Sequence, residues 1–450
     1  MPTTPDIVIS PANEAYKVPD NRAAKATTAT AQKSRTGETM LSLQWYGSKD
    51  VRVVEAPVPA ISEPTDAICR VTGTSVCDGD LQLYYKEPRQ LVRGDILGYE
   101  WMGIVDEIGP EVKNLKVGDR VVASSQVACG SCKACTKRDF SKCSKWSTAT
   151  AQQKFHGRPS SGLSKHGHFI GGQAEYARCP FADVNLIKVP DSIPDEKALY
   201  LSYSVPVSYH AVVCADIREG NSVAIWGAGS IGLYAAKWSF LAGARRVIVI
   251  DSVKEYLKIA EAMGCNAINF EEDLDVLSAI YKLEPEGVDC AIDTATRSTK
   301  GLLHTIQRSI GFEIGSSGNV NEALGAVKQL GTVSLVADYA TLTNRFLLGA
   351  LMEKGITLRG TDQTPVQKYW NDLMRKVENG EFDPAIILSH RFQLDELREL
   401  YDALDKGEIS VLKTFIQTRF SHSPAPGTPQ LSSLKSGTLK PSIAAYHNGV

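Results

Sequence analysis

Four cysteines stand close together in the sequence, with a spacing that suits a metal ion. Cys129, Cys132, Cys135 and Cys143 form a C-x2-C-x2-C-x7-C pattern, the densest group of thiols in the 450-residue chain. Short loops bring the first three sulfurs within reach of one ion, and the longer loop returns the fourth to complete a tetrahedron. Because four thiolates leave no open coordination position, the pattern predicts one structural zinc. The alternatives are four unrelated thiols or two disulfides, and a disulfide framework does not suit a long chain without a dense cysteine pattern overall.

A second motif has the form of a dinucleotide-binding loop. Gly227, Gly229 and Gly232 form G-x-G-x-x-G directly after the apolar run SVAIW and at the start of an expected helix. Such glycines allow a tight turn, a close approach to a pyrophosphate and close packing of helix on strand. Asp251 ends the next expected strand, where a carboxylate binds the ribose hydroxyls and favours NAD(H) over NADP(H). The predicted NAD(H)-binding residues are therefore Gly227, Gly229, Ser230, Ile231, Gly232 and Asp251, against the alternatives of a plain strand-to-helix turn and a helix-capping aspartate.

Composition limits the classes of protein to which the chain can belong. With 43% apolar residues, 22% charged residues and a net charge of -2, it is typical of a soluble globular protein with two domains. No basic stripe indicates a nucleic-acid partner. No apolar stretch approaches the roughly 20 residues that a membrane span needs. The other six cysteines are scattered, so a reducing cytoplasm is the expected location, with no signal peptide expected.

Two kinds of element must position these motifs. Short β-rich runs broken by turn residues, such as DAICRVTGTSV and DRVVASS, predict a mostly β first domain. Apolar strands that alternate with helical stretches, as around SVAIWGAG and RVIVIDS, predict a doubly wound parallel sheet, and hence an α/β protein. The expected division is a disordered tail over 1–38, the β-rich catalytic domain over 39–200, the Rossmann domain over 201–361, a return to the first domain over 362–419, and a disordered tail over 420–450.

This order of features is similar to that of the zinc-dependent medium-chain alcohol dehydrogenase superfamily. The phrases GGQAEYARCPFADVN, over 171–185, and TDQTPVQKYW, over 361–370, resemble the formaldehyde dehydrogenase and formaldehyde dismutase branch. The resemblance covers about 40–418. It implies a GroES-like catalytic domain, a Rossmann cofactor domain, an active site in the cleft between them, a small-molecule substrate, and a homo-oligomer that is a dimer or a tetramer.

The family also holds a second, catalytic zinc through three protein ligands, and the matching positions differ here. The first ligand lies in a Cys-x-Ser/Thr-Asp-x-His phrase, which corresponds to the run from Cys77 to Gln82. Cysteine and aspartate are present as Cys77 and Asp80. Gly79 replaces the hydroxyl residue that contacts the substrate oxygen, and Gln82 replaces the histidine that relays its proton outward.

The other two ligand positions both carry phenols. Tyr99 stands where a Gly-His-Glu phrase has histidine, next to Glu100, and Tyr203 stands where a Leu-Ser-Asp phrase has aspartate. A neutral phenol is a poor zinc ligand compared with imidazole or carboxylate. We therefore expect no catalytic zinc. The alternative is a zinc alcohol or aldehyde dehydrogenase that uses Cys77, Glu100 and a histidine recruited from His156, His166 or His168.

The expected activity follows from an intact cofactor motif beside an altered metal position. Hydride transfer belongs to the nicotinamide, whereas zinc matters most when negative charge builds on an oxygen attached to the reacting carbon. We therefore expect an NAD(H)-dependent oxidoreductase that reduces an activated C=C bond, an iminium or a carbonyl of a specialised-metabolism intermediate. Tyr99 and Tyr203 then offer O–H groups as hydrogen-bond donors or as a proton source, and Asp80 orients Tyr99. The phenols could equally be space-filling, and a non-redox cyclase, an isomerase or a silent dinucleotide-binding protein stays open.

Overall fold

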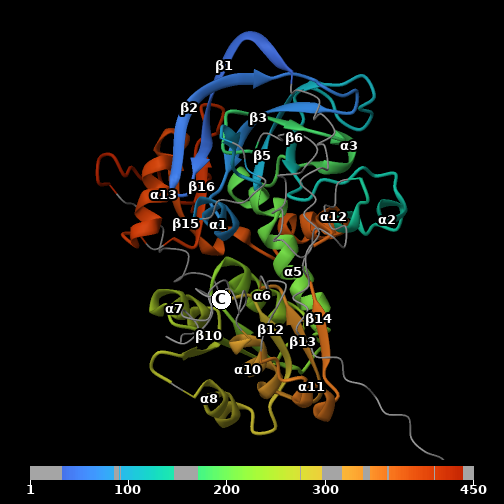
Figure 1. Ribbon diagram of the computed structural model, residues 1–450, viewed down its shortest axis with the longest axis vertical. Coiled ribbons are helices and arrows are strands. Elements are labelled where there is room, and N and C mark those ends of the chain that lie inside the picture. The colour runs from blue at the N-terminus through green and yellow to red at the C-terminus, as the bar shows by residue number, and fades with distance from the viewer. Residues whose placement is uncertain are drawn as a thin grey trace, which may run out of the picture.

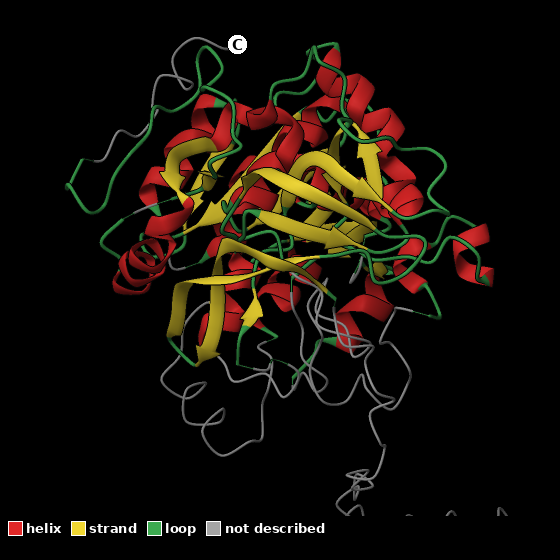
Figure 2. Ribbon diagram, turned by 90° about the horizontal axis from the view of Figure 1, so that it is seen from above, coloured by secondary structure: helices red, strands yellow, loops and turns green. Residues whose placement is uncertain are grey.

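The structure is a computed structural model that describes residues 33–85, 91, 93–145, 171–273, 275–295, 317–337, 345–361, 364–409 and 411–438. Its two parts are a β-rich domain, in the upper half of Figure 1, and a domain built around a parallel sheet, in the lower half. Figure 2 shows helices on both sides of the strands when the molecule is seen from above. The predicted α/β architecture is confirmed.

The lower domain has the doubly wound form that alternating strands and helices predict. Its sheet has the order β11-β10-β9-β12-β13-β14, and neighbouring strands in it run parallel to one another. Alternate residues of the central strand enter different cores: Val223 and Ile225 pack in one cluster, and Ala224 and Trp226 in another. Both faces of the sheet are therefore covered by helices. The elements are β9 (Ser222–Trp226), α6 (Ser230–Leu241), β10 (Arg246–Asp251), α7 (Lys254–Ala262), β11 (Asn266–Asn269), α8 (Val276–Leu283), β12 (Val288–Asp293), α10 (Gly318–Ala326), β13 (Val327–Leu335), α11 (Leu348–Lys354) and β14 (Thr357–Gly360).

The upper domain combines strands from both ends of the chain. A seven-stranded sheet runs in the order β15-β16-β3-β5-β6-β8, with β7 also paired to β3, and a smaller sheet has the order β2-β1-β4. The last strands of the chain thus lie beside β3. The strands are β1 (Ser34–Gly47), β2 (Asp50–Pro59), β3 (Ala67–Thr74), β4 (Asp95–Ile96), β5 (Trp101–Ile108), β6 (Arg120–Ala123), β7 (Tyr176–Cys179), β8 (Leu186–Lys188), β15 (Leu388–Gln393) and β16 (Lys413–Gln417).

Short helices complete the upper domain and join it to the lower one. They are α1 (Asp78–Tyr85), α2 (Lys133–Thr136), α3 (Ala182–Asn185), α4 (Asp195–Ala198), α5 (Ser204–Ala215), α12 (Val366–Glu378) and α13 (Leu397–Lys406), with 3-10 turns at Phe140–Lys142, Leu199–Ser202, Pro384–Ile387 and Leu394–Glu396. Helix α5 packs on α6 and also contacts α12. Helix α5, which begins directly after Tyr203, therefore connects the upper domain to the lower one. No helix in these described ranges is long and apolar enough to cross a membrane.

The C-terminal segment differs from the disordered tail expected over 420–450. Leu431 bridges to Arg391 of β15, and the buried Ser432 donates its N–H to the Arg391 carbonyl at 2.8 Å. The Ala425 N–H donates to the buried Glu196 carboxylate at 3.1 Å. Serine hydroxyls and backbone amides here satisfy buried acids, so a Ser/Pro/Gly-rich composition is compatible with order. Residues 439–450 and 1–32 lie outside the described residues, and β1 already includes residues 34–38 of the expected N-terminal tail.

Deleting residues 424–450 is expected to lower the midpoint of thermal unfolding by several degrees. A buried acceptor that loses its donor costs about 1–3 kcal/mol, and each kcal/mol shifts the midpoint by about 2–4 °C in a domain of 150–250 residues. Deletion of 439–450 alone is the control, with no comparable shift expected. Equal midpoints for both truncations, measured by calorimetry, would contradict the packing role of 424–438.

Candidate functional site

The four cysteines of the metal motif converge in the folded chain. Their sulfurs all lie within 4.8 Å of one another, and Cys132 and Cys135 approach to 3.5 Å. Backbone amides point at the sulfurs: the Cys129 N–H donates to Cys143 Sγ and the Ser144 N–H to Cys132 Sγ, each at 3.4 Å. Amide donors from Cys135 and Ser144 lower the pKa of the Cys132 thiol to about 5. The donor set fits the structural zinc that the spacing predicts.

Sequence reasoning missed the residues that hold this loop in place. The Asn185 amide accepts from the Ala128 N–H and donates to the Ala128 carbonyl, each at 2.9 Å, and thus fixes the residue before Cys129. Gln367, near the start of α12, donates to the Asn185 side chain at 2.9 Å and to the Gln126 carbonyl at 2.6 Å. Both amides lie within the phrases that carry the family resemblance. Their place in these phrases was the one signal in the sequence that they matter, because the loop residues that they contact lie far away in the chain.

The glycine motif forms the expected turn between β9 and α6. Gly227 has φ +97°, which favours glycine, and a Cβ at Gly232 would overlap the Gly227 carbonyl oxygen. A Cβ on Gly229, in contrast, would meet nothing within 4 Å. The backbone at the N-terminus of α6 is thus open on the side where Ser230 and Ile231 are partly exposed. Its free N–H groups and helix dipole suit a pyrophosphate.

Asp251 stands at the end of β10, but its carboxylate also holds the loop. Oδ2 accepts the Ala228 N–H at 2.6 Å, and Oδ1 accepts the Ser252 N–H at 2.7 Å and the Val253 N–H at 3.0 Å. The capping alternative therefore describes part of its role. A carboxylate has about four lone-pair sites, so one remains for a ribose hydroxyl.

Cys77, Tyr99, Asp80 and Tyr203 gather where α1, β5 and α5 begin. Cys77 Sγ lies 2.6 Å from Tyr99 Oη and 3.0 Å from Asp80 Oδ2, which also accepts the Cys77 N–H at 3.1 Å. The Tyr99 and Tyr203 rings meet edge to face, with centroids 4.9 Å apart. Asp80 and Tyr99 both contact the Cys77 sulfur, so an orienting effect of Asp80 on Tyr99 would pass through Cys77.

Burial sets the protonation of this cluster. Desolvation raises the pKa of the Cys77 thiol well above its usual value, with Asp80 adding to the shift. Desolvation and the neighbouring Cys77 do the same for the Tyr99 phenol. Burial raises the pKa of Asp80 to about 6, although its hydrogen bonds from Cys77 oppose the shift. Both the thiol and the phenol therefore keep their protons at neutral pH.

Glu100, the other acid expected at the site, is held by a buried ion pair and by hydrogen bonds from two serines. Its Oε2 accepts from Lys413 Nζ at 2.6 Å and from the Ser75 hydroxyl, and its Oε1 accepts from the Ser204 hydroxyl at 2.7 Å and from the Ser204 N–H at 3.1 Å. Glu100 is 0% and Lys413 1% exposed. Sequence reasoning missed Lys413. A lysine that begins the otherwise apolar run KTFI was its one signal.

The residues at the catalytic position do not fit a zinc ion. Both oxygens of Glu100 are taken, and the Cys77 sulfur is engaged by a phenol and a carboxylate. Within the described ranges, the only group of three or more histidine, cysteine, aspartate or glutamate donors close enough to hold an ion is the four-cysteine loop. His156, His166 and His168, which the zinc alternative needs, lie outside the described residues.

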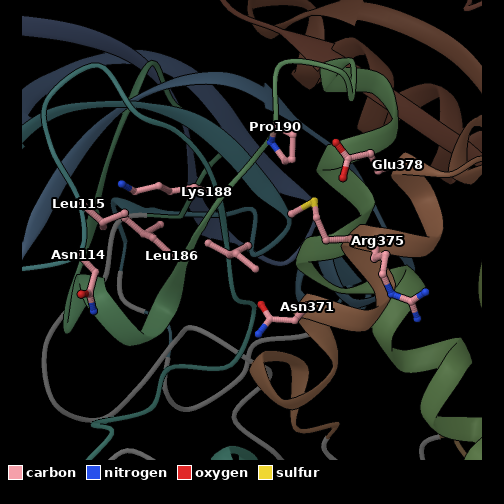
Figure 3. A pocket seen from close by; sticks show the side chains of 10 residues that line it. Asn114, Leu115, Leu186, Lys188, Pro190, Asn371, Arg375 and Glu378 are labelled. Carbon is pink, nitrogen blue, oxygen red and sulfur yellow. The ribbon is translucent and has the colours of Figure 1, made fainter.

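A surface hollow of about 420 Å³ lies elsewhere, between β8 and α12 (Figure 3). It contains none of the predicted site residues. Its two cations are already paired, Lys188 with Asp119 at 2.9 Å and Arg375 with Asp372 at 2.7 Å. The hollow therefore gives no ground for moving the candidate site away from Cys77.

Known proteins resemble this chain along most of its length. Residues 63–191 match the alcohol dehydrogenase GroES-like domain, and residues 230–303 match the zinc-binding dehydrogenase family. A zinc-type alcohol dehydrogenase-like protein of Schizosaccharomyces pombe is 35% identical over 387 residues, 84% of this chain and 91% of that protein. The glutathione-independent formaldehyde dehydrogenase of Pseudomonas aeruginosa is 31% identical over 386 residues, 81% of this chain and 94% of that protein.

A solved structure extends the likeness to three dimensions. The alcohol dehydrogenase of Thermus sp. ATN1 superposes with a TM-score of 0.71 at 27% identity, covering 84% of this chain and all of that one. These matches confirm the resemblance and the fold inferred from the motifs.

Replacing Lys413 with Met is expected to destabilise the protein by about 3–5 kcal/mol, because it leaves the Glu100 carboxylate buried without its cation. The double variant Glu100→Gln/Lys413→Met removes both charges and should recover most of that loss. Urea unfolding measures both. Lys435→Met is the matched control: this lysine is 49% exposed and pairs with Asp395 at 3.2 Å, so a change within about 1 kcal/mol is expected. A similar loss in both single variants would contradict the role given to Lys413.

Proposed function

The chain is an NAD(H)-dependent oxidoreductase of the zinc-type medium-chain dehydrogenase/reductase family, and we propose that it reduces an activated C=C bond, an iminium or a carbonyl without a catalytic zinc. The observation that carries the proposal is that the candidate zinc ligands Cys77 and Glu100 already form hydrogen bonds with other side chains. Cys77 is engaged by Tyr99 and Asp80, and Glu100 is engaged by Lys413 and two serines. Three free ligands, which catalytic zinc sites use, are therefore not available there.

In this proposal the cofactor supplies the hydride and the protein supplies position. NAD(H) is held at Gly227, Gly229, Ser230, Ile231 and Gly232, with its ribose on Asp251. Tyr99 and Tyr203 lie at the substrate end, where Tyr99 Oη offers a proton or a hydrogen bond to the atom that gains electron density. We further propose a dimer or tetramer in the cytoplasm. Ten unpaired cysteines support a reducing compartment.

Metal content tests the absence of a catalytic zinc. The purified protein is expected to hold one zinc per subunit, and Cys143→Ser should lower that content, because among the described residues only the four-cysteine loop offers a complete donor set. The double variant Tyr99→His/Tyr203→Asp is expected to bind a second zinc, since it adds an imidazole and a carboxylate beside Cys77. Tyr99→Phe/Tyr203→Phe is the matched control and should stay at one. Two zinc ions per subunit in the unaltered protein would refute the proposal and favour the zinc-dependent alternative.

Cofactor use tests the redox reaction itself. NADH is expected to bind, as measured by fluorescence titration, and to be consumed with at least one of three probes: cyclohexenone, cinnamaldehyde or an N-methyl dihydroisoquinolinium salt. Gly229→Val is expected to weaken NADH binding, because its side chain would enter the open space at the N-terminus of α6. Gly47→Val, at the end of β1, where an added Cβ also meets nothing within 4 Å, is the control for a general effect of such a change. Absence of NADH binding by the unaltered protein would rule out the redox function.

A further inference from the structure

We propose that Tyr99, Cys77 and Asp80 form a proton relay that links the substrate to a buried carboxylate. This inference rests on the proposed function and adds what supplies the proton. The three groups form one unbroken line of contacts, 2.6 Å from Tyr99 Oη to Cys77 Sγ and 3.0 Å from Cys77 Sγ to Asp80 Oδ2. The line begins at Tyr99, which is 9% exposed, passes through the partly exposed Cys77 and ends at Asp80, whose side chain is fully buried.

The proton of Cys77 decides which group donates in each hydrogen bond of the relay. The Cys77 thiol has one proton and two neighbouring acceptors, the Asp80 carboxylate and the Tyr99 oxygen. Hydrogen bonds to an ionised acceptor are the stronger ones, so the S–H donates to Asp80. The Tyr99 hydroxyl oxygen is the other acceptor of the same S–H, at 2.6 Å. When the thiol turns to Tyr99, the phenol proton points away from the sulfur, toward the substrate side.

Protonation of Asp80 allows the line to run the other way. Asp80 Oδ1 is buried and has no hydrogen-bond partner among the described residues. The proton that the line uses sits on Oδ2, the oxygen facing Cys77, so the Cys77 S–H gives up its bond to that oxygen and turns to Tyr99 Oη. The protonated carboxyl group then donates to the sulfur, the thiol donates to Tyr99, and the phenol proton is free for the substrate.

Gly79 leaves the space that this arrangement needs. A Cβ at position 79 would overlap the Tyr99 hydroxyl, so any other residue there would displace the phenol oxygen from the sulfur. Tyr99 itself is 9% exposed, whereas Cys77, Gly79 and Tyr203 are partly exposed around it. Tyr99 therefore lies between the buried acid and the partly exposed residues Gly79 and Tyr203, the side from which we propose that the substrate approaches.

The relay supplies the proton that completes the reduction of the substrate. Bound NADH would supply a hydride to the electrophilic carbon, forming a C–H bond and leaving NAD⁺, while the π electrons move to the carbonyl oxygen or to the α carbon. That atom takes the Tyr99 proton, Tyr99 takes the Cys77 proton, and Cys77 takes the Asp80 proton. The products are the reduced substrate, NAD⁺ and an Asp80 carboxylate, which regains a proton through Tyr99 and Cys77 when water replaces the product.

The relay also distinguishes between substrate classes. A carbonyl or an activated C=C bond needs a proton to complete its reduction. A quaternary iminium does not, because the C=N π pair becomes the nitrogen lone pair when hydride arrives. The inference therefore assigns this site to proton-requiring substrates.

The test compares two probes, cyclohexenone and an N-methyl dihydroisoquinolinium salt, with NADH as reductant. With cyclohexenone, Tyr99→Phe, Cys77→Ala and Asp80→Asn are each expected to lower kcat about 100-fold or more, with little change in KM. Cys77→Ser should restore most of the rate lost in Cys77→Ala, because a hydroxyl can still accept and donate. A solvent deuterium isotope effect on kcat should accompany cyclohexenone reduction. Iminium reduction, where it occurs, should show neither effect.

Tyr401→Phe is the matched control for loss of a buried phenol, since Tyr401 bonds to Gln173 outside the line. If the unaltered protein reduces cyclohexenone and Asp80→Asn and Cys77→Ala do so equally fast, the relay is wrong and the proposed function stands. Turnover of the iminium alone, or equal slowing of both probes in every variant, also overturns the relay. If the unaltered protein oxidises NADH neither with these two probes nor with cinnamaldehyde, the proposed reduction and its relay fail together. Should Asp80→Asn not fold, the Cys77→Ser and Cys77→Ala pair decides.

Discussion

The buried pair of Glu100 and Lys413 holds together the part of the molecule in which chemistry is possible. Its carboxylate receives hydrogen bonds from Ser75 after β3, from Ser204 at the start of α5 and from Lys413 at the start of β16. Four segments that are distant in sequence therefore meet on two oxygen atoms. Taking a charge out of water is costly, so these donors are needed together, and the fold brings them together only when the C-terminal strands have returned to the first domain.

This pair also determines what its neighbours can do. Because Glu100 is fixed in a complete shell of donors, the adjacent Tyr99 is positioned by a rigid strand end. Tyr203 is likewise fixed, since it directly precedes Ser204. The two phenols meet edge to face while Tyr99 Oη rests on Cys77. A structural ion pair thus helps to set the geometry of the candidate site.

The parts of this structure that sequence alone could predict depend on local spacing. The four-cysteine loop and the Gly227 to Gly232 turn are each formed by residues near one another in the chain, so their types and intervals carry the information. Lys413 pairs with a residue more than 300 positions away, and no local pattern indicates that contact. The order of residues 420–438 was missed for the same reason: their polar groups bind Glu196, Arg391 and Glu396, acids and a base contributed by other elements.

The candidate site combines predictable residues in an arrangement that was not predictable. Cys77, Asp80, Tyr99 and Tyr203 were identified by position, but which of them touch was set by the space above Gly79. A zinc ion would place positive charge beside a developing oxyanion, whereas a line of phenol, thiol and carboxylic acid places a proton there. A transferred proton neutralises the developing charge outright, and it can do so on carbon as well as on oxygen. A site of this kind is therefore suited to electrophiles whose electrons leave the reacting carbon toward either atom, a wider range than a Lewis acid that acts on oxygen alone.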